Sequence, residues 1–550
     1  MAITAITIEN FKGIKDPVRV ELKPITLLFG PNSAGKSTVV QALHYAREVL
    51  SNNNVDADLV CGVDESMNLG GFRNLVHGHD ISRTIRLAFD FQLDGDLFEP
   101  FLALESIGDY NHWVDKGNWE LEPHETFYDI RENFEIESAA ISLEIAWSEF
   151  FNEPFLKKYS IAFEGHPLAS IEAKPGGKDI AITDFNYQHP SFIMKDDESL
   201  VPRNVPYFAA LFLQAIREPY FGFPESALLP LASQKSALPE WNKKLELSEV
   251  CFIPKEDRDD SILFEGDPEG IINGLLSQLF VRPGEILLKE LEQTRYIGPI
   301  RKTPPRNYNP VRSDDASRWT NGLAAWDRLY LGSDDFIGEV GGWMGGSEFL
   351  DSGFSLVYRK FKRIDVDSPL YASLVRSSGL DEEEDLGSQL ESLPETREIV
   401  VVDENRNIQV YPQDIGIGIS QLLPVVVGAL DRAIKTLIIE QPELHLHPGL
   451  QCRLGDLFIQ QIHEQPGKLF LLETHSEHLL LRLMRRIRET AEGDLPLGHP
   501  GLDAEKLSVN FIDWSPTNGT QIGRLQIGVD GDSLGKWPDG FFEERAGELF

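Results

Sequence analysis

The sequence predicts an α/β fold, and three observations support this. A short apolar run at residues 25–29, of the fully buried kind, leads through a glycine-rich loop into a helical pattern from Lys36 to Leu50. Strand-like and helical segments alternate again in residues 419–490. Between these two parts, strand-like stretches are spaced as in an antiparallel meander. We therefore expect one α/β core assembled from both ends of the chain, with an antiparallel β-subdomain and a helical insert.

Length and composition indicate how the chain divides. Its 550 residues suffice for roughly two to four units of ordinary domain size. The middle of the chain holds many prolines and few helical segments, which sets it apart from both ends. We expect an N-terminal half of the core at residues 1–185, a partly helical insert at 186–395, a C-terminal half of the core at 396–495, and a tail at 496–550.

Apolar periodicity and turn residues predict the individual elements. In the N-terminal half we expect strands at 3–8, 18–22, 83–92, 138–147, 158–164 and 168–173. In the insert we expect helices at 207–217 and 269–280, and a solvated loop at the acidic run 381–385. A hairpin is expected at 398–403 and 407–411. Toward the C-terminus we expect helices at 420–433, 449–464 and 476–490, strands at 435–439 and 468–472, and two strands with an aromatic end within 508–550.

The composition argues for a cytoplasmic protein without membrane contact. No run of 18 apolar residues occurs, and the start of the chain lacks the basic and apolar regions of a secretory signal. The three cysteines, Cys61, Cys251 and Cys452, are too few and too scattered for a disulfide framework or a zinc site.

The formal net charge of −37 bears on the choice of partner. A chain this acidic does not attract nucleic acid through its average field, so DNA or RNA would need a local basic patch or a second subunit. Candidate patches are small. One example consists of Arg482, Arg485, Arg486 and Arg488 on one predicted helix, and we interpret it as a solvated helix face.

The glycine-rich loop carries the strongest motif of the chain. Residues 30–37 (GPNSAGKS) fit the pattern GxxxxGK[ST], in which the loop backbone wraps phosphates, the lysine reaches the β- and γ-phosphates, and the final hydroxyl binds Mg²⁺. A strand precedes the loop and a helix follows it, which argues against a chance match. We therefore predict ATP and Mg²⁺ as ligands. The residues that we expect to bind the nucleotide are Gly30, Pro31, Asn32, Ser33, Ala34, Gly35, Lys36, Ser37 and Thr38.

Two later strands end in polar residues. The apolar run 437–439 ends at Glu440, which is the Walker B pattern, and we expect Glu440 to bind Mg²⁺ together with Ser37. The apolar run at 471–472 ends in Glu473, Thr474 and His475. In a parallel sheet this strand would lie beside the first and bring His475 near the γ-phosphate.

Six segments carry a resemblance to a known family. They are IENFKGIKD at 8–16, GPNSAGKST at 30–38, FRNLVHGHD at 72–80, GIGISQLLP at 416–424, IIEQPELHLHP at 438–448 and ETHSEHLL at 473–480. With these segments the chain resembles the ABC-type ATPases of the SMC, RecF and OLD group, from residue 3 to about residue 490. It is similar in particular to a prokaryotic subfamily that has a WP-x-GFF segment like that at 537–542. The resemblance implies an ABC-type P-loop ATPase head.

The resemblance also implies that ATP is bound between two copies of the head. The P-loop of one copy would face the signature segment of the other, which here is Gly416–Gln421. This segment departs from the usual LSGGQ-like form, but Gly416, Gly418 and Ser420 precede or begin a predicted helix whose N-terminus suits an anion. An ordinary helix cap is the alternative interpretation.

A second departure concerns hydrolysis. ABC-type heads commonly carry a glutamate after the Walker B acid, and this chain has Gln441 there. A glutamine can orient water but cannot accept its proton, so we expect slow turnover. Gln441 is our main catalytic candidate, and Glu443 and His475 are candidates to assist it.

Two further patterns have competing explanations. OLD nucleases carry a Toprim domain after the ATPase, but too few residues follow His475 here, and we interpret Asp530 and Asp532 as flanking a turn at Gly531. Glu443, His445 and His447 could suggest a metal site, but we interpret them as alternation on an extended segment.

Three functions remain open at this point. The first is an ATP-gated homodimer that controls a separate effector, for example a nuclease, in DNA maintenance or antiphage defence. The second is a conventional P-loop kinase acting on a small molecule. The third is a scaffold that binds ATP without hydrolysing it.

Overall fold

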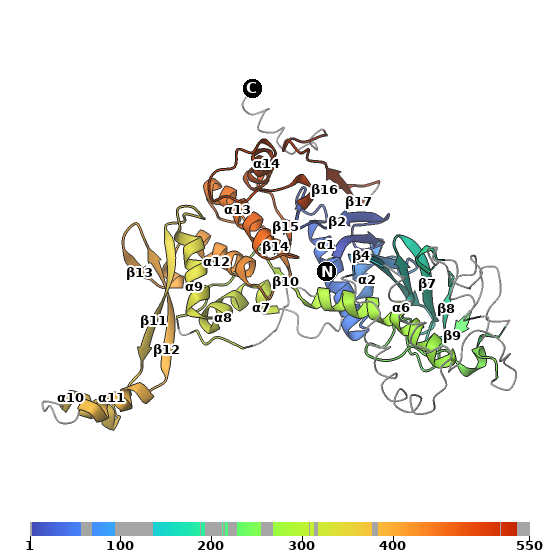
Figure 1. Cartoon of the computed structure of the whole chain (residues 1–550), viewed down its shortest axis with the longest axis horizontal. Helices are drawn as coiled ribbons and strands as arrows, with labels where there is room; N and C mark the ends of the chain where they lie inside the picture. The colour runs from blue at the N-terminus through green and yellow to red at the C-terminus, as the bar shows by residue number, and fades with distance from the viewer. Residues whose placement is uncertain are drawn as a thin grey trace, which may run out of the picture. The chain divides into compact units, whose positions relative to one another are not determined.

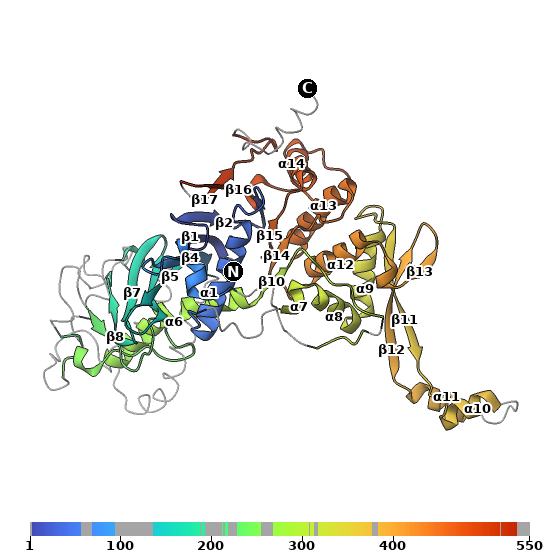
Figure 2. The ribbon, with the colours of Figure 1, turned by 180° about the vertical axis from the view of Figure 1, so that it is seen from behind.

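The computed structural model describes residues 3–56, 69–93, 136–186, 189–192, 212, 215–217, 228–254, 268–306, 308–312, 317–376, 383–517 and 519–535. The chain forms two compact units, and each consists of two segments that are far apart in the sequence (Figures 1 and 2). The first comprises Met1–Thr294 with Leu507–Gln526, and the second comprises Arg295–Lys506 with Ile527–Phe550. Residues 186–395, expected as one insert, therefore contribute to both units.

An antiparallel sheet makes up much of the first unit. Its strand order is β2-β1-β4-β5-β6-β7-β8-β9 among the described residues. Strands β4 to β8 pair antiparallel in chain order, which confirms the meander expected from the sequence. Side chains alternate between buried and less buried positions along strands such as β4. The strands are β1 (Ile3–Glu9), β2 (Val18–Glu21), β4 (Ile85–Gln92), β5 (Ser138–Ser148), β6 (Glu153–Phe163), β7 (His166–Lys174), β8 (Lys178–Thr183) and β9 (Leu229–Pro230).

A second group of strands in the first unit includes β3 (Ile25–Phe29), which is buried along its whole length. Strand β16 (Leu507–Ser515) pairs with it in parallel, and β17 (Gly519–Leu525) pairs with β16 antiparallel. The two tail strands expected from the sequence are thus confirmed, and they extend the N-terminal core. The helices of this unit are α1 (Lys36–Asn52), α2 (Phe72–Leu75), η3 (His77–His79), η5 (Pro190–Phe192), η7 (Glu249–Cys251) and α6 (Pro268–Glu292).

The second unit contains three neighbouring strands in the order β10-β14-β15. Its strands are β10 (Thr294–Ile297), β14 (Thr436–Glu440) and β15 (Leu469–Glu473). Strands β14 and β15 are parallel, and α13 (Pro448–Glu464) connects them, as the sequence predicts. The other helices of its main body are α7 (Ser317–Thr320), α8 (Leu323–Leu331), α9 (Asp334–Gly345), η9 (Pro412–Asp414), α12 (Ile417–Leu430), α14 (Glu477–Glu492) and η10 (Ala504–Lys506).

A β-ribbon also belongs to the second unit. Strands β11 (Phe354–Lys362) and β12 (Glu395–Asp403) pair antiparallel over their whole length, and β13 (Ile408–Val410) completes the expected hairpin. Helices α10 (Pro369–Arg376) and α11 (Glu383–Ser392) follow at the far end of the ribbon (Figure 1). The expectation of a loop at 381–385 is wrong from Glu383 onward, because Glu, Leu and Gln are good helix formers and outweigh the single glycine there.

The arginines of α14 are also arranged differently from the expectation. Arg486 is buried, with its Nε 2.7 Å from Oδ1 of Asp456 and its Nη1 2.6 Å from Oε2 of Glu489. Arg482 pairs with Asp456 as well, and Arg485 pairs with Glu489. The interpretation of a solvated face is wrong for Arg482 and Arg486, because two acidic residues on the inner side draw their guanidinium groups inward.

Some expectations lie outside the described residues. These are most of the helix at 207–217, Cys61, and the aromatic end of the tail. No helix in the described part of the chain is both long and apolar enough to cross a bilayer.

Candidate functional site

The loop between β3 and α1 has a backbone that demands glycine at two positions. Gly30 has φ +146°, and a Cβ atom there would lie 2.0 Å from the carbonyl oxygen of Ile512. Gly35, at φ +111°, precedes α1 in a left-handed conformation, and Ser33 is left-handed as well, at φ +63°. Left-handed turns directly before a helix N-terminus are the backbone pattern of an anion-binding nest. The backbone of the predicted phosphate loop therefore suits an anion.

Lys36 is the first residue of α1 and is 4% exposed. Its Nζ donates to the carbonyl oxygens of Gly30 at 3.0 Å and of Pro31 at 2.9 Å, so the ammonium group lies against the loop. Ser37 follows it in the first turn of the helix. Of the other predicted ligands, Pro31, Asn32 and Ser33 are exposed, whereas Ala34 and Thr38 are buried.

A residue of the tail shapes the same loop. The hydroxyl of Thr520, in β17, donates to the carbonyl oxygen of Ala34 at 2.9 Å, and its N–H donates to that of Gly13 at 3.0 Å. Thr520 is fully buried. A Cβ atom at Gly35 would lie 3.0 Å from the Thr520 side chain, so the loop packs closely on it. Sequence reasoning missed this residue, because nothing local in the tail relates it to the loop.

The acidic strand ends of the second unit lie side by side. In the parallel pair of β14 and β15, Glu440 is in register with Glu473, as expected for adjacent strands. Burial, together with a hydrogen bond to the Glu440 carboxylate and the charge of Glu473, raises the pKa of the Tyr296 hydroxyl. Tyr296, on β10, therefore stays neutral and acts as a hydrogen-bonding partner of Glu440.

The segment after Glu440 is a tight turn. Gln441 and His445 adopt left-handed conformations, with φ of +47° and +63°. The N–H of Leu444 donates to Gln441 O at 3.1 Å, and that of Leu446 donates to Glu443 O at 3.0 Å. The interpretation of Glu443, His445 and His447 as alternation on an extended segment is therefore wrong, because main-chain hydrogen bonds close the segment into turns.

His447 and the aspartates of the tail have structural roles. The Nδ1 of His447 accepts from the N–H of Gly449 at 3.2 Å and caps α13. Gly531, at φ +74°, donates its N–H to Gly528 O, and Asp532 O accepts from the N–H of Gly528. The turn expected between Asp530 and Asp532 is thereby confirmed.

Glu443 forms hydrogen bonds to the loop that follows β15. Its Oε2 accepts from the hydroxyl of Thr474 at 2.8 Å, and its Oε1 accepts from the N–H of His475 at 2.8 Å. Burial raises the pKa of the Glu443 carboxyl, although these hydrogen bonds and the charge of Arg301 oppose that rise. His475 is exposed. Both carboxylate oxygens of Glu443 are thus engaged in positioning the residues next to His475.

The signature segment Gly416–Gln421 forms the start of α12. Gly416 precedes the helix and is exposed, without a side-chain cap. The hydroxyl of Ser420 donates to Ile417 O of the same helix at 2.9 Å, and Ser420 is buried. A Cβ atom at Gly418 would lie 2.6 Å from His445 O, so this helix packs directly on the turn after β14.

Arg301 is the main residue of this region that sequence reasoning missed. Its backbone N–H and carbonyl are held by the side-chain amide of Gln421, at 2.9 and 2.6 Å. Its guanidinium group reaches the carbonyl oxygens of Glu440 and Gln441. It falls in the segment expected as an insert. A signal was present, since Arg301 follows the apolar, glycine- and proline-containing run 296–300.

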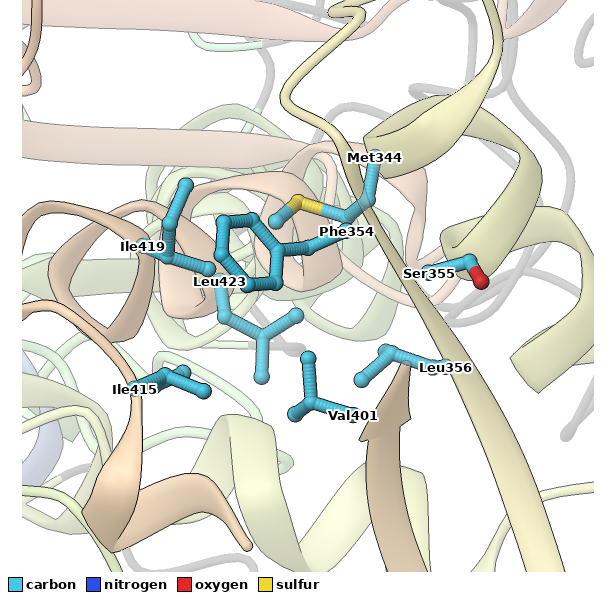
Figure 3. A pocket seen from close by; sticks show the side chains of 8 residues that line it. All are labelled: Met344, Phe354, Ser355, Leu356, Val401, Ile415, Ile419 and Leu423. Carbon is cyan, nitrogen blue, oxygen red and sulfur yellow. The ribbon is translucent and has the colours of Figure 1, made fainter. Parts of the chain in front are cut away.

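An apolar pocket lies behind the signature segment (Figure 3). Ile419 and Leu423 of α12 face Phe354 of β11 and Met344 of α9 across it. Val401 of β12 also lines it. Its lining lacks charged side chains, so we interpret it as a packing contact that joins the β-ribbon to α12 rather than as a ligand site.

Family models match the two regions that carry these motifs. Residues 1–155 match the model described as "AAA ATPase domain", and residues 299–482 match "AAA domain, putative AbiEii toxin, Type IV TA system". Together the two matches span more than half of the chain and include the phosphate loop, Arg301, the signature segment and both strand ends. The chain belongs to the AAA-type ATPases. The α/β ATPase fold expected from the sequence is thereby confirmed.

Three solved structures are distantly similar to this ATPase. One is an SMC head bound to the C-winged helix domain of ScpA, with 10% identity and a TM-score of 0.39, covering 96% of this chain and 98% of that chain. The SMC head domain from Thermotoga maritima has 9% identity and a TM-score of 0.34, covering 96% of this chain and 100% of that chain. The Pyrococcus furiosus SMC head with an extended coiled coil, bound to the C-terminal domain of ScpA, has 9% identity and a TM-score of 0.36, covering 100% of this chain and 98% of that chain. Likenesses this distant carry no argument, and no curated protein matches the sequence.

Proposed function

We propose that this ATPase binds ATP and Mg²⁺ as a homodimer, hydrolyses ATP slowly, and thereby controls a separate effector protein. The observation that carries the proposal is Lys36, held at the N-terminus of α1 against a loop with three left-handed residues. The positive charge, the helix N-terminus and the loop backbone together suit the phosphates of a nucleotide.

The nucleotide phosphates and the metal would be held by different groups. In this proposal Lys36 and the backbone of residues 30–38 bind the phosphates, and Ser37 and Glu440 bind Mg²⁺. Mg²⁺ would supply the charge that stabilises phosphoryl transfer. Tyr296 supports this role of Glu440, because a neutral hydroxyl hydrogen-bonded to the carboxylate fixes its orientation without competing for charge.

Dimer formation would use the start of α12. Gly416 is exposed and has no side-chain cap, so main-chain N–H groups at this end can meet an anion from a second copy. Ser420 is buried against its own helix, which favours Gly416 and Gly418 over Ser420 as the groups that contact the nucleotide.

Slow hydrolysis follows from the groups available to act on water. Gln441 can orient a water molecule but cannot accept a proton. Glu443 has both oxygens engaged with Thr474 and His475, which leaves it poorly placed to serve as the base. A long-lived ATP-bound dimer would suit a switch that reports to an effector, for example a nuclease, in DNA maintenance or antiphage defence.

The proposal also includes a cytoplasmic location and no direct contact with nucleic acid. Cys251 and Cys452 are free, which fits the reducing cytoplasm. Acidic residues pair with Arg482, Arg485 and Arg486 and reduce the basic character of α14, so nucleic acid would be met through the effector.

The molar mass of the full chain in solution tests the proposal. We expect light scattering to show a doubled mass with Mg²⁺ and a non-hydrolysable ATP analogue, and no doubling for Lys36→Ala. A chain that binds ATP but stays monomeric, or that transfers phosphate to a small molecule, would support the kinase alternative instead. Among dimeric outcomes, phosphate release separates a slow ATPase from a scaffold without turnover.

A further inference from the structure

Arg301 connects the signature segment to the turn after β14. Its Nη1 donates to Gln421 O at 3.3 Å, and its Nη2 donates to Glu440 O at 2.6 Å and to Gln441 O at 3.2 Å. The side-chain amide of Gln421 in turn accepts a hydrogen bond from the N–H of Arg301 and donates one to its carbonyl oxygen. One buried residue therefore bridges α12 and the residues that follow the Walker B strand.

The cost of burying this arginine indicates more than a packing role. Arg301 is 2% exposed, and burial lowers its pKa to about 10, although Glu443, Tyr296 and Glu440 favour the charged form. It therefore remains protonated at neutral pH. Its Nε is buried without a hydrogen-bond acceptor among the described residues. An apolar side chain would fill this space without the desolvation of a charge.

The guanidinium group of Arg301 binds a strained part of the main chain at Gln441. Gln441 is left-handed, with φ +47°, and a residue other than glycine in that conformation costs roughly 1–2 kcal/mol. The N–H of Gln441 donates to Glu473 O at 2.7 Å, and its carbonyl oxygen accepts from Arg301. Both peptide groups of Gln441 are thus fixed. Its carbonyl oxygen accepts from Arg301 and also from the N–H of Leu444 within the turn, so Arg301 supplies the side-chain attachment.

The signature segment shares this attachment. The guanidinium group that binds Gln441 also binds Gln421, and Gly418 packs so closely on His445 that a side chain would clash with its carbonyl oxygen. The start of α12 is therefore linked to the turn after β14 in two ways, through Arg301 and through the packing of Gly418 on His445.

We infer that Arg301 is a positioning residue that couples the signature segment to Gln441, so that engagement of the signature segment sets the conformation of the residue that orients the attacking water. The inference rests on the proposed function, in which Gln441 has that task. Arg301 touches neither the nucleotide nor the water in this scheme. It acts through the main chain of Gln441.

A double-mutant cycle tests the coupling on turnover. Arg301→Lys keeps the charge, but a single ammonium group cannot span three carbonyl oxygens. We expect it to lower kcat about tenfold or more while the Kd for ATP changes less than about twofold, because a small misplacement near the reacting atoms costs rate rather than binding. In a Gln441→Ala background the same substitution should lower kcat by less than about twofold.

Arg486→Lys is the matched control. Arg486 is a buried arginine of the same unit that pairs with Asp456 and Glu489, away from the signature segment. It should lower stability without changing the kcat of the folded enzyme. Equal loss of kcat from Arg301→Lys in both backgrounds would overturn the coupling, as would a loss confined to ATP affinity.

Hydrogen exchange on the protein without nucleotide tests the coupling independently of ATPase activity. We expect Arg301→Lys to speed amide exchange in residues 417–421 and 441–446 together, and Arg486→Lys to leave both segments unchanged. Faster exchange in only one of the two segments, or in neither, would refute the coupling. A protein that shows the joint change but has no turnover would contradict the proposed function and leave the coupling standing.

Discussion

The hydroxyl of Thr520 donates a 2.9 Å hydrogen bond to the carbonyl oxygen of Ala34, across 486 positions of the sequence. The same residue binds Gly13 through its N–H and is fully buried. The tail strand β17 therefore does more than extend a sheet. It fixes the main chain of the phosphate loop just before the glycine that opens α1.

Thr520→Val should weaken ATP binding about fivefold. The substitution keeps the shape of the side chain but leaves Ala34 O without its donor, and a lost hydrogen bond of this kind is worth about 1 kcal/mol. Calorimetric titration with ATP measures the effect. Thr520→Ser keeps the hydroxyl and should lose much less, so equal losses in the two variants would mean that packing rather than the hydrogen bond supports the loop.

Lys36→Ala should abolish measurable ATP binding. Lys36 is the lysine that the loop holds at the N-terminus of α1, where it can neutralise phosphate charge. Calorimetry provides the measurement, with Lys157→Ala on the exposed side of β6 as a control for the loss of one positive charge. An unchanged affinity in Lys36→Ala would remove the phosphate-loop assignment altogether.

The phosphate loop and the hydrogen bonds of Arg301 differ in how far they could be predicted from the sequence. Strand 25–29, the glycine loop and the helix after it follow from local patterns, and the structure confirms all three elements. Arg301 and Gln421 are separated by 120 positions, and their hydrogen bonds involve main-chain atoms that no residue pattern encodes. The prediction of an extended segment after Glu440 was wrong for a different reason.

In that segment, the side chains of Glu443, His445 and His447 alternate as on a strand. The main chain instead turns at left-handed Gln441 and His445, where contacts with distant residues outweigh the local preference. Alternation over so few residues was too weak a signal to distinguish a strand from a turn. The same tertiary contacts explain why the engagement of Glu443 with Thr474 and His475 could not be foreseen.

Glu440→Gln should weaken ATP binding more in the presence of Mg²⁺ than in its absence. The substitution removes the charge that Mg²⁺ would meet at the end of β14, while the amide can still accept a hydrogen bond from Tyr296. A loss of roughly 10–100-fold in metal-dependent affinity is typical when a metal site is disturbed. Titrations with Mg²⁺ and with EDTA make the comparison, and equal losses in both would speak against a metal role.

Stability should depend on Lys468 at alkaline pH. Its Nζ is buried and donates to Asp431 O at 2.8 Å, and burial lowers its pKa from the ordinary 10.5 to about 8. Between those values the unfolded chain binds more protons than the folded one, so the free energy of unfolding rises with pH. Below about pH 8 both states are protonated, and the full cost of burying the charge is present.

Comparison with Lys468→Met isolates this contribution from other titrations. Relative to the variant, the wild type should gain roughly 1.5 kcal/mol between pH 8 and pH 9.5. Urea unfolding at several pH values provides the measurement. A difference between the two proteins that stays constant over this range would show that Lys468 titrates near its ordinary pKa.

Gln441→Glu tests the slow-switch proposal most directly. If Gln441 orients the attacking water, a carboxylate in its place adds a group that can also accept the proton. A positioned base contributes about 10²–10⁴-fold, so the steady-state rate should rise about tenfold or more once other steps limit it. The side chains match in shape, and Glu473 and Arg301 hold the main chain of this residue in either case.

The rise in rate should come with a shorter-lived ATP-bound dimer, because faster hydrolysis ends the closed state sooner. Phosphate release and dimer lifetime are therefore measured on the same samples. Gln409→Glu, at an exposed position of β13, controls for the added negative charge and should change neither quantity. A flat or lower rate for Gln441→Glu with intact ATP affinity would mean that Gln441 does not face the water. Glu443 or His475 would then have to act as the base, although the hydrogen bonds of Glu443 to Thr474 and to the N–H of His475 would have to break before its carboxylate could do so.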